Sequence, residues 1–219
     1  MRNTNLKTNV YSQNGEDGII NHLLKAINSE KDYWCCEFGA WDGKHYSNTF
    51  NLVENDGYNA VHIEGDEPKF QELLKTCEKF KKIIPLKEYI NEKNLLDDIL
   101  SKTDIPKNFD VLSIDVDGID YSIWNNFKNY SPKIVIIEIN SGLEPKKLYN
   151  DDELTEKVLY SRPGVNFSTC YELAKRKNYS LFFHTGNMIF VHNNYKHLVE
   201  CYNDENYMEA FDKTWGGFK

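Results

Sequence analysis

Short apolar runs alternate with amphipathic segments over most of the chain. The apolar runs occupy positions 33–38, 60–63, 83–86, 111–114 and 134–139, and apolar residues at helical spacing lie near 47–55, 68–79, 93–101 and 121–127. Alternation of this kind predicts parallel strands that are joined by right-handed helical crossovers. The run KIVIIEI is almost continuously apolar, which indicates a strand that is buried on both faces of the sheet.

Both ends of the chain depart from this alternation. Residues 15–28 carry apolar side chains at helical spacing after a polar arm. Near the other end, YSLFFHTGNMIFVHN contains two β-rich runs that are joined by the tetrapeptide HTGN. We predict an antiparallel hairpin here, in which Gly186 and Asn187 can adopt positive φ. A helix near 167–177 is expected before this hairpin, and another is expected after Asn194.

Positions 141–166 form a long polar connection after the fifth apolar run. They contain Pro145 and the pair Pro163-Gly164, and connections of this length are commonly functional or mobile. The segment follows a strand at the end of the sheet where ligands are expected to bind. We therefore interpret it as a lid or substrate-binding insertion with a short helix around 152–159. The alternative is an irregular surface loop.

Length and composition fit one globular domain over residues 1–219, with an arm and first helix at 1–30 and the insertion at 141–166. The chain has 219 residues, of which 40% are hydrophobic, and this is enough for a substantial core. Its net charge of -8 argues against nonspecific binding to nucleic acid. No apolar run approaches the length of a membrane span, and the first residues are too polar for a signal peptide.

The cysteines give no sign of a disulfide framework or a zinc site. They are scattered, odd in number and without C-x-x-C spacing: Cys35, Cys36, Cys77, Cys170 and Cys201. A reducing, cytoplasmic location is therefore expected. The oligomeric state is not predicted by any pattern in the chain.

Every strand predicted for the parallel part ends in a polar or acidic cluster. Ligands of open α/β sheets bind beyond the carboxyl ends of the strands, so these clusters are the first candidates for a site. In chain order the clusters are EFGAWDG, EGD, LKEY, DVDG and EIN. Carboxylates that gather on one edge repel one another unless hydrogen bonds, a cation or a cationic ligand offset the repulsion.

The turn after the first strand has the pattern Glu37-x-Gly39-x-x-x-Gly43 in place of the dinucleotide-binding G-x-G-x-x-G. Gly39 would let the backbone approach a ligand closely, and an acid at position 37 can orient an ammonium group. Glu64, at the end of the second strand, is placed to accept hydrogen bonds from two ribose hydroxyls. An amino-acid-bearing nucleoside such as S-adenosylmethionine would use all three features. The alternative for Glu64 is a loop carboxylate that faces water.

Several stretches taken together resemble one known family. SQNGEDGI, CEFGAWDGKHYSNT, VHIEGD, DVLSIDVDGIDYSIW and IVIIEIN occur in this order between positions 11 and 192. They resemble the FkbM-like branch of the class I S-adenosylmethionine-dependent methyltransferases. The resemblance implies an α/β fold of the Rossmann-like methyltransferase type: a mostly parallel seven-stranded sheet that ends in an antiparallel hairpin, with helices on both faces.

The same resemblance implies O-methylation with S-adenosylmethionine as the cofactor. The acceptor would be a sugar hydroxyl of a glycan or a nucleotide sugar, or another small molecule that bears a hydroxyl group. We expect neither nucleic acid nor a membrane as a partner. The identity of the acceptor and the hydroxyl that is methylated are not determined by these motifs.

The resemblance also assigns the cofactor site position by position. Glu37 and Gly39 match the first cofactor motif, and Glu64 matches the acid that binds ribose. Asp115 falls in the fourth-strand motif near the methyl-transfer centre, and the segment 87–90 lies where such folds contact adenine. The further cofactor-binding candidates in these stretches are Gln13, Ala40, Asp42, Ser47, Asn48, Gly65, Glu88 and Tyr89.

An all-oxygen set is expected where the fourth and fifth strands end side by side. Asp115 and Asp117 follow one strand, and Glu138 and Asn140 end the other. Such groups suit Mg²⁺, Mn²⁺ or Ca²⁺ better than zinc, so Asp115, Glu138 and Asn140 are candidate ligands of a divalent cation. The alternative is that Asp117 caps the following helix and that Glu138 meets a basic partner.

Methyl transfer to an alcohol also requires that the hydroxyl loses its proton. In the absence of a metal, the candidates for the base are His45 after the first strand, His184 at the hairpin, and Asp117. Asp115 is a catalytic candidate because of its place in the fourth-strand motif. Asp117 and Arg162 are candidates for contacting the acceptor. The chain has Asp-Gly at 117–118 where many family members have Glu-Gly, which leaves the role of this aspartate open.

The polar arm YSQNGED has two interpretations, which can coexist. It can be a helix cap, in which Ser12 or Asn14 starts the helix and Glu16 and Asp17 lie near its positive end. It can also be an arm that folds over the cofactor with Gln13 in contact.

Two other functions fit the same fold class. A nicotinamide-dependent oxidoreductase is one, but the missing G-x-G-x-x-G argues against it. The other is a noncatalytic glycan-binding domain, since a fold does not fix a function. The presence of Glu37, Gly39, Glu64 and Asp115 argues against such a loss of activity.

Overall fold

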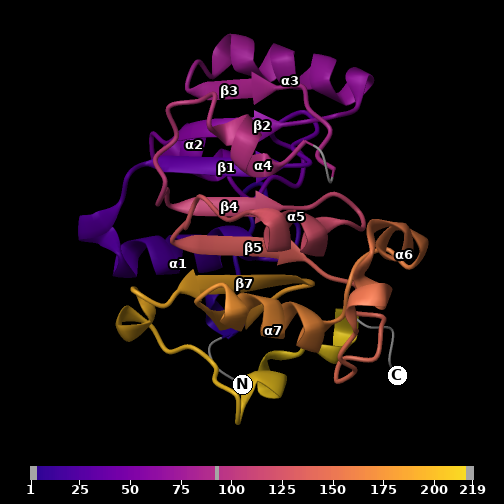
Figure 1. The fold of residues 1–219 in the computed structure, drawn as a ribbon. Helices are drawn as coiled ribbons and strands as arrows, with labels where there is room; N and C mark the ends of the chain where they lie inside the picture. Colours follow the sequence, from indigo (N-terminus) through magenta and orange to yellow (C-terminus); the bar gives the residue numbers. More distant parts are fainter. Residues whose placement is uncertain (1–3, 92–93, 216–219) are drawn as a thin grey trace.

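One mixed sheet of seven strands organises the computed structural model, which describes residues 4–91 and 94–215. The strands are β1 (Trp34–Phe38), β2 (Asn59–Ile63), β3 (Ile83–Leu86), β4 (Val111–Ile114), β5 (Ile134–Glu138), β6 (Tyr179–His184) and β7 (Asn187–His192). Their order across the sheet is β3-β2-β1-β4-β5-β7-β6 (Figure 1). β1 to β5 pair in parallel, whereas β7 is antiparallel to both β5 and β6. The predicted parallel core with a C-terminal antiparallel hairpin is confirmed.

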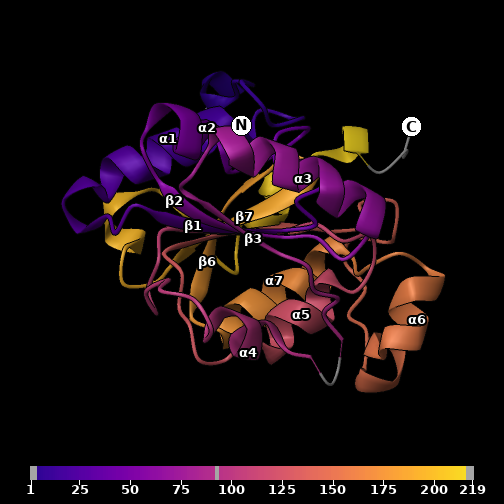
Figure 2. The same ribbon diagram turned by 90° about the horizontal axis from the view of Figure 1, so that it is seen from above.

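Helices cover both faces of this sheet, as predicted. They are α1 (Glu16–Ala26), α2 (Phe50–Asn55), α3 (Glu67–Lys79), α4 (Leu96–Leu100), α5 (Asp120–Asn126), α6 (Glu156–Ser161) and α7 (Phe167–Arg176). α1, α2 and α3 lie on one face, and α4, α5 and α7 lie on the other (Figure 2). α6, which belongs to the insertion 141–166, lies beyond the carboxyl ends of the parallel strands, on the right of Figure 1. Within the described residues, no helix combines the length and the apolar character that crossing a membrane requires.

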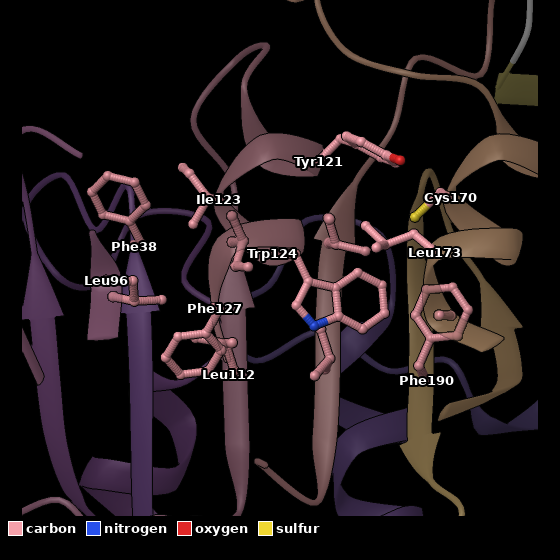
Figure 3. Close-up of a cluster of buried hydrophobic side chains, with 14 of the residues drawn as sticks. Phe38, Leu96, Leu112, Tyr121, Ile123, Trp124, Phe127, Cys170, Leu173 and Phe190 are labelled. Atoms are coloured by element: carbon pink, nitrogen blue, oxygen red, sulfur yellow. The ribbon is translucent and has the colours of Figure 1, made fainter. Parts of the chain in front are cut away.

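The central strands are buried on both faces because successive side chains point to opposite layers. In β4, Val111 packs in the apolar cluster under α1, and Leu112 packs in the cluster under α5. Trp124 of α5 is fully buried in the second cluster, with its ring centroid 5.2 Å from that of Phe190. Figure 3 shows this indole in the middle of the cluster, with Phe190 beside it. Both layers therefore hold β4 firmly, and with it the turn that follows.

Two predicted helices are shorter than their apolar spacing indicates. The helix predicted at 47–55 begins only at Phe50, because the three residues before it hydrogen-bond to the carboxylate of Glu37 instead of continuing the helix. Part of the helix predicted at 93–101 falls at Lys93, outside the described residues. The described part of that segment forms the five-residue α4.

The insertion and the C-terminal end also differ from the sequence predictions. The helix expected around 152–159 is divided at Thr155, whose backbone is extended, into a 3₁₀ turn and α6. No α-helix follows Asn194 in the described residues. Asn203 accepts hydrogen bonds from nearby backbone amides, and such local bonds compete with a helix. Short 3₁₀ turns replace it at Lys196–Leu198, Tyr207–Ala210 and Lys213–Trp215.

The turn of the hairpin needs only one residue in the left-handed region. Gly186 has φ +102, as predicted, because residues with a side chain rarely adopt this conformation. Asn187 was also expected to be able to take positive φ, but it is not among the residues with positive φ and instead begins β7. The two strands are therefore joined by Thr185 and Gly186 alone.

A buried lysine ties together the opposite end of the sheet. Lys133 precedes β5 and has 1% of its side chain exposed. Its ammonium lies 2.7 Å from the carboxylate of Asp110, which is fully buried, and 2.6 Å from that of Asp32. Asp110 also accepts hydrogen bonds from the backbone amides of residues 32 and 33. These charges fix the segments that enter β1, β4 and β5 relative to one another.

We expect Lys133→Ala to lower the free energy of unfolding by about 3–5 kcal/mol, because it leaves the carboxylate of Asp110 buried without its cation. Urea denaturation measures this change. The matched control is Lys175→Ala, which breaks exposed ion pairs and should cost less than about 1 kcal/mol. Equal losses in the free energy of unfolding in the two variants would show that the burial of Lys133 does not make its ion pairs more stabilising than exposed ones.

Candidate functional site

Two adjoining cavities lie at the carboxyl ends of the parallel strands. The first cavity, of about 520 Å³, is lined by the turns after β1, β2 and β3. The second cavity, of about 490 Å³, is lined by the residues that follow β5, by the hairpin turn and by Trp215. Residues from three parts of the chain border both cavities: Gln13, Asp115, Asp117 and Glu138. We call this boundary the junction.

Glu37, at the end of β1, holds the loop that leads into α2. Its carboxylate accepts hydrogen bonds from the backbone amide of Asn48 at 2.9 Å, from the Thr49 hydroxyl at 2.6 Å and from the Ser47 hydroxyl. Burial raises the pKa of Glu37, and these hydrogen bonds oppose that rise. Glu37 also borders the first cavity, but Ser47 and Asn48, which the sequence assigned to the cofactor, line neither cavity.

Gly39 occupies a place that only glycine can fill. Its φ is +82, and a Cβ there would lie 1.8 Å from the carbonyl oxygen of Asp115. The amides of Gly39 and Ala40 both donate to the carbonyl of Ile63 at 3.1 Å. Asp42 accepts hydrogen bonds from the backbone amides of Lys44 and His45. Ala40 and Asp42 therefore shape the turn without lining a cavity, whereas Gly39 lines the first one.

Glu64, at the end of β2, is oriented by backbone amides and borders the first cavity. One carboxylate oxygen accepts from the amide of Trp41 at 2.9 Å, and the other accepts from the amide of Asp66 at 2.8 Å. Only 7% of Glu64 is exposed. Each carboxylate oxygen has a further lone pair, so this group can still accept hydrogen bonds from a ligand.

Tyr89 forms an aromatic wall of the first cavity. Its ring lies against Gly65, where a Cβ would come within 2.5 Å of the ring. Tyr89 as a whole residue is 66% exposed, and the ring face away from Gly65 is available for stacking. Glu88 lines the same cavity and accepts a hydrogen bond from the Asn94 side chain at 3.0 Å. The structure thus brings Glu64, Gly65, Glu88 and Tyr89 together at one cavity, and their binding to a cofactor stays a prediction.

The junction contains a pair of carboxyl groups that share a proton. Ile114 of β4 pairs with Ile137 of β5, so the residues that follow, Asp115 and Glu138, end the strands side by side. The two side chains are hydrogen-bonded, and a bond between two carboxyl groups requires a proton. Burial and the charge of Asp115 raise the pKa of Glu138 to about 9. Lost hydration and the charge of Asp117 raise the pKa of Asp115 to about 6. Near neutral pH the proton therefore lies on Glu138, and Asp115 is mainly ionised.

Asp120, which the sequence analysis missed as a site residue, fixes the turn after β4. Its carboxylate accepts hydrogen bonds from the amides of Val116 and Gly118, both at 2.9 Å. Burial raises its pKa to about 7. Asp117 does not cap α5, because that helix follows Ile119 without a side-chain cap. An aspartate in the first turn of a predicted helix was the signal that could have identified Asp120.

Asp117 itself is left facing the junction. Its backbone is in the left-handed region, with φ 56, which is strained for a residue with a side chain. It is exposed to both cavities and adds a negative charge near Asp115. The structure therefore places Asp117 where a ligand could reach it.

The proposed metal ligands do not form a coordination site. Asn140 donates to the carbonyl of Arg162 at 2.8 Å and accepts from the amide of Gly142 at 3.0 Å, so its side chain holds the insertion. Within residues 4–91 and 94–215, no group of three or more histidine, cysteine, aspartate or glutamate side chains is arranged to hold a metal ion. We therefore assign no chemical step to a divalent cation.

Arg162 lies inside the insertion, and neither cavity includes it. Its guanidinium donates to the carbonyls of Glu153 at 2.8 Å and Gly164 at 3.0 Å, and it stacks on Tyr149 at 3.8 Å. These contacts anchor α6 near the junction. The insertion reaches the first cavity through Tyr160 and the second through Pro163 and Gly164.

The two candidate histidines have different surroundings. His45 is exposed and borders the first cavity, with its ring against those of Trp41 and Tyr46. His184 has 1% of its surface exposed, and its ring nitrogens meet the Ser141 hydroxyl and the Asp212 amide, both at 3.1 Å. Burial lowers the pKa of His184 to about 4, so this ring is neutral. His184 lines neither cavity, and we do not assign it as a base.

The sequence analysis also missed several aromatic residues at the cavities. Trp41 and Tyr46 line the first cavity, and Trp215 lines the second. Trp41 and Tyr46 have positive φ, and both residues are exposed. Trp215 packs over the hairpin turn, where a Cβ on Gly186 would lie 3.3 Å from the indole. Trp41 belongs to a quoted motif, but nothing in the sequence brings Trp215 to this place.

The shared proton makes the stability of the protein depend on pH. The folded-state pKa of Glu138 is above its ordinary value of 4.5, so the folded protein binds this proton more tightly than the unfolded chain does. The stabilisation is complete below that ordinary value and is lost as the pH rises toward about 9.

We expect the free energy of unfolding to fall over this window and Glu138→Gln to reduce the fall. Urea denaturation at several pH values, with the exposed-site variant Glu78→Gln as a control, measures the effect. The same pH slope in all three proteins would contradict a shared proton.

Comparison with known proteins shows a shared fold. No family model matches the chain, and no curated protein matches it. The N-terminal domain of EvdMO1, crystallised in the presence of SAH and D-fucose, superposes with a TM-score of 0.50 at 11% identity, covering 81% of this chain and 82% of that one. The CurJ carbon methyltransferase gives a TM-score of 0.50 at 9% identity, covering 83% of this chain and 56% of that one. The chain also superposes on a longer EvdMO1 structure, of which it covers 45%, with a TM-score of 0.50. The fold is therefore the Rossmann-like fold of class I methyltransferases.

Proposed function

We propose that this chain is an S-adenosylmethionine-dependent O-methyltransferase. It would bind the cofactor in the first cavity and a neutral, hydroxyl-bearing acceptor, most simply a sugar, in the second. The observation that carries the proposal is that the two cavities meet at Asp115 and Glu138. A methyl donor on one side and an alcohol on the other would then face each other across a group that can take up a proton.

The first cavity fits the parts of this cofactor. Its volume of about 520 Å³ is within the usual range for a small-molecule site. The amide-oriented carboxylate of Glu64 can accept hydrogen bonds from the two ribose hydroxyls, and Tyr89 offers a face for the adenine ring. Gly39 lines the first cavity beside the junction, where the amino-acid part would lie. When bound, the cofactor supplies an electrophilic methyl group on a positively charged sulfur.

The junction can handle the proton of an alcohol. Asp115 is mainly ionised near neutral pH, so it can accept a hydrogen bond and then the proton from an acceptor hydroxyl. Glu138 keeps its own proton and donates it to Asp115, which holds the carboxylate in one orientation. A negative junction also favours a positively charged sulfur next to it. Alignment of the oxygen with the methyl group would supply much of the remaining rate.

The charge of the second cavity favours a neutral acceptor over an anionic one. Its acidic lining residues are Asp115, Asp117, Asp120 and Glu138, and none of the described residues that line it is basic. Carboxylate oxygens accept hydrogen bonds from hydroxyl groups but repel a phosphate. The indole of Trp215 offers an apolar face to a sugar ring. We therefore favour a glycan or free sugar over a nucleotide sugar.

S-adenosylhomocysteine, the product of the cofactor, should raise the melting temperature. At one hundred times its Kd it would stabilise the folded state by about 2.7 kcal/mol. NAD(H) is the comparison, because stabilisation by NAD(H) alone would favour an oxidoreductase.

A second experiment uses cofactor with a labelled methyl group. The label should pass to D-fucose, methyl glucoside or oligosaccharides faster than to glucose phosphate or UDP-glucose. Binding of S-adenosylhomocysteine with label only on the anionic sugars would refute the neutral acceptor, and no binding would refute the methyltransferase.

Glu64→Ala should weaken binding of S-adenosylhomocysteine by about 1.5–3 kcal/mol, or roughly 10- to 150-fold in Kd, because it removes charge-assisted hydrogen bonds to the ribose. Isothermal titration calorimetry measures the Kd. Glu78→Ala, at an exposed position of α3 away from both cavities, is the matched control and should bind as the wild type does. An unchanged Kd in Glu64→Ala would place the ribose elsewhere.

A further inference from the structure

The polar arm before α1 is folded by its own side chains into a fixed loop. One carboxylate oxygen of Asp17 accepts three hydrogen bonds of 2.8 Å, from the successive backbone amides of Val10, Tyr11 and Ser12. The hydroxyl oxygen of Ser12 in turn accepts a hydrogen bond from the amide of Asp17 at 3.0 Å. Asp17 is 2% exposed, so these bonds are shielded from water. The acid at the end of SQNGED therefore shapes the arm itself.

A second acid joins the arm to the hairpin turn. Glu16 is fully buried, and one of its carboxylate oxygens accepts from the Thr185 hydroxyl at 2.6 Å and from the Asn187 amide group at 3.4 Å. The other oxygen accepts from the backbone amide of Asn14 at 2.8 Å. Both ends of this contact belong to segments that border the second cavity. Movement of the arm would therefore require breaking buried, charge-assisted hydrogen bonds.

Gln13 is the residue that this arrangement presents to the junction. It borders both cavities, together with Asp115 and Glu138. The side chain of Asn9 donates to its backbone carbonyl at 3.0 Å, which fixes the main chain at this position. The Gln13 side chain is exposed, and within the described residues it has no hydrogen-bond partner. The start of α1 does not use it, because the N-cap residue is Gly15 and the amide of Asp17 donates to Ser12.

We propose that Gln13 contacts the acceptor oxygen at the junction and sets its line of approach, and that Glu16 positions Gln13 through the arm. This inference rests on the proposed methyltransferase function. A hydroxyl oxygen that gives its hydrogen to Asp115 still has lone pairs, and the amide of Gln13 can donate to one of them. Two fixed partners restrict the orientation of the oxygen, which is what an in-line transfer requires. A neutral amide does this without adding a cation to the acidic junction.

The first test needs no acceptor. In isotope-labelled protein, the side-chain amide signals of Gln13 are identified by their loss in Gln13→Ala. Saturating S-adenosylhomocysteine places its sulfur at the junction, so these signals should shift. Those of Gln71, an exposed glutamine on α3 that lines neither cavity, should not. If S-adenosylhomocysteine binds and the Gln13 signals stay in place, the role of Gln13 is overturned while the proposed function stands. If it does not bind, the proposed function itself is overturned.

The second test separates positioning from folding. Gln13→Ala should lower kcat at least tenfold with the neutral sugars above. Its melting temperature should equal that of the control Gln71→Ala, and its Kd for S-adenosylhomocysteine should stay within threefold of the control value. Glu16→Ala should lower kcat by a similar factor, and the double variant should be little worse than either, because both changes remove one contact. Independent, multiplying losses would mean that Glu16 does not act through Gln13. Unchanged kcat in Gln13→Ala would refute the contact with the acceptor.

Discussion

A single proton between Asp115 and Glu138 allows two neighbouring strands to end in adjacent carboxyl groups. The register that pairs Ile114 with Ile137 is set by the apolar core on both faces of β4 and β5, and it leaves the next side chains no choice of neighbour. Two ionised carboxylates on neighbouring strand ends would repel each other. Their raised pKa values keep one proton in place, so the pair is stable and still carries about one negative charge near neutral pH. Both cavities open onto this pair.

The other acids at the strand ends reach stability by a different route. Glu37 accepts from hydroxyls and an amide of the loop before α2, Glu64 accepts from two backbone amides, and Asp120 accepts from two more. Hydrogen bonds therefore offset the repulsion between these carboxylates, which was one of the alternatives that the sequence left open beside a cation or a cationic ligand. The same bonds give each carboxylate one orientation. The acids along this edge of the sheet therefore form a set of hydrogen-bond acceptors with fixed orientations.

The two ends of the chain complete the walls of the site. The arm 9–17 is held to the hairpin turn by Glu16, and the segment around Trp215 packs over Gly186 in the same turn. His184 is covered by this segment, through the amide of Asp212, and so becomes part of the support for the turn instead of a group in the cavity. The parallel sheet thus supplies the junction, while the antiparallel hairpin supplies the surface on which both ends rest.

The sequence by itself determined the sheet, because buried parallel strands require long apolar runs and their crossovers require amphipathic helices. It also indicated Gly39, Glu64 and Asp115, since residues that end such strands must meet at one edge. It did not determine which acids face a ligand and which face their own loops. Ser47 and Asn48 serve Glu37, Asn140 and Arg162 serve the insertion, and Asp120 holds the turn before α5. Only the tertiary structure decided these roles, because they depend on hydrogen bonds and pKa shifts between segments far apart in the chain, and periodicity carries no information about such contacts.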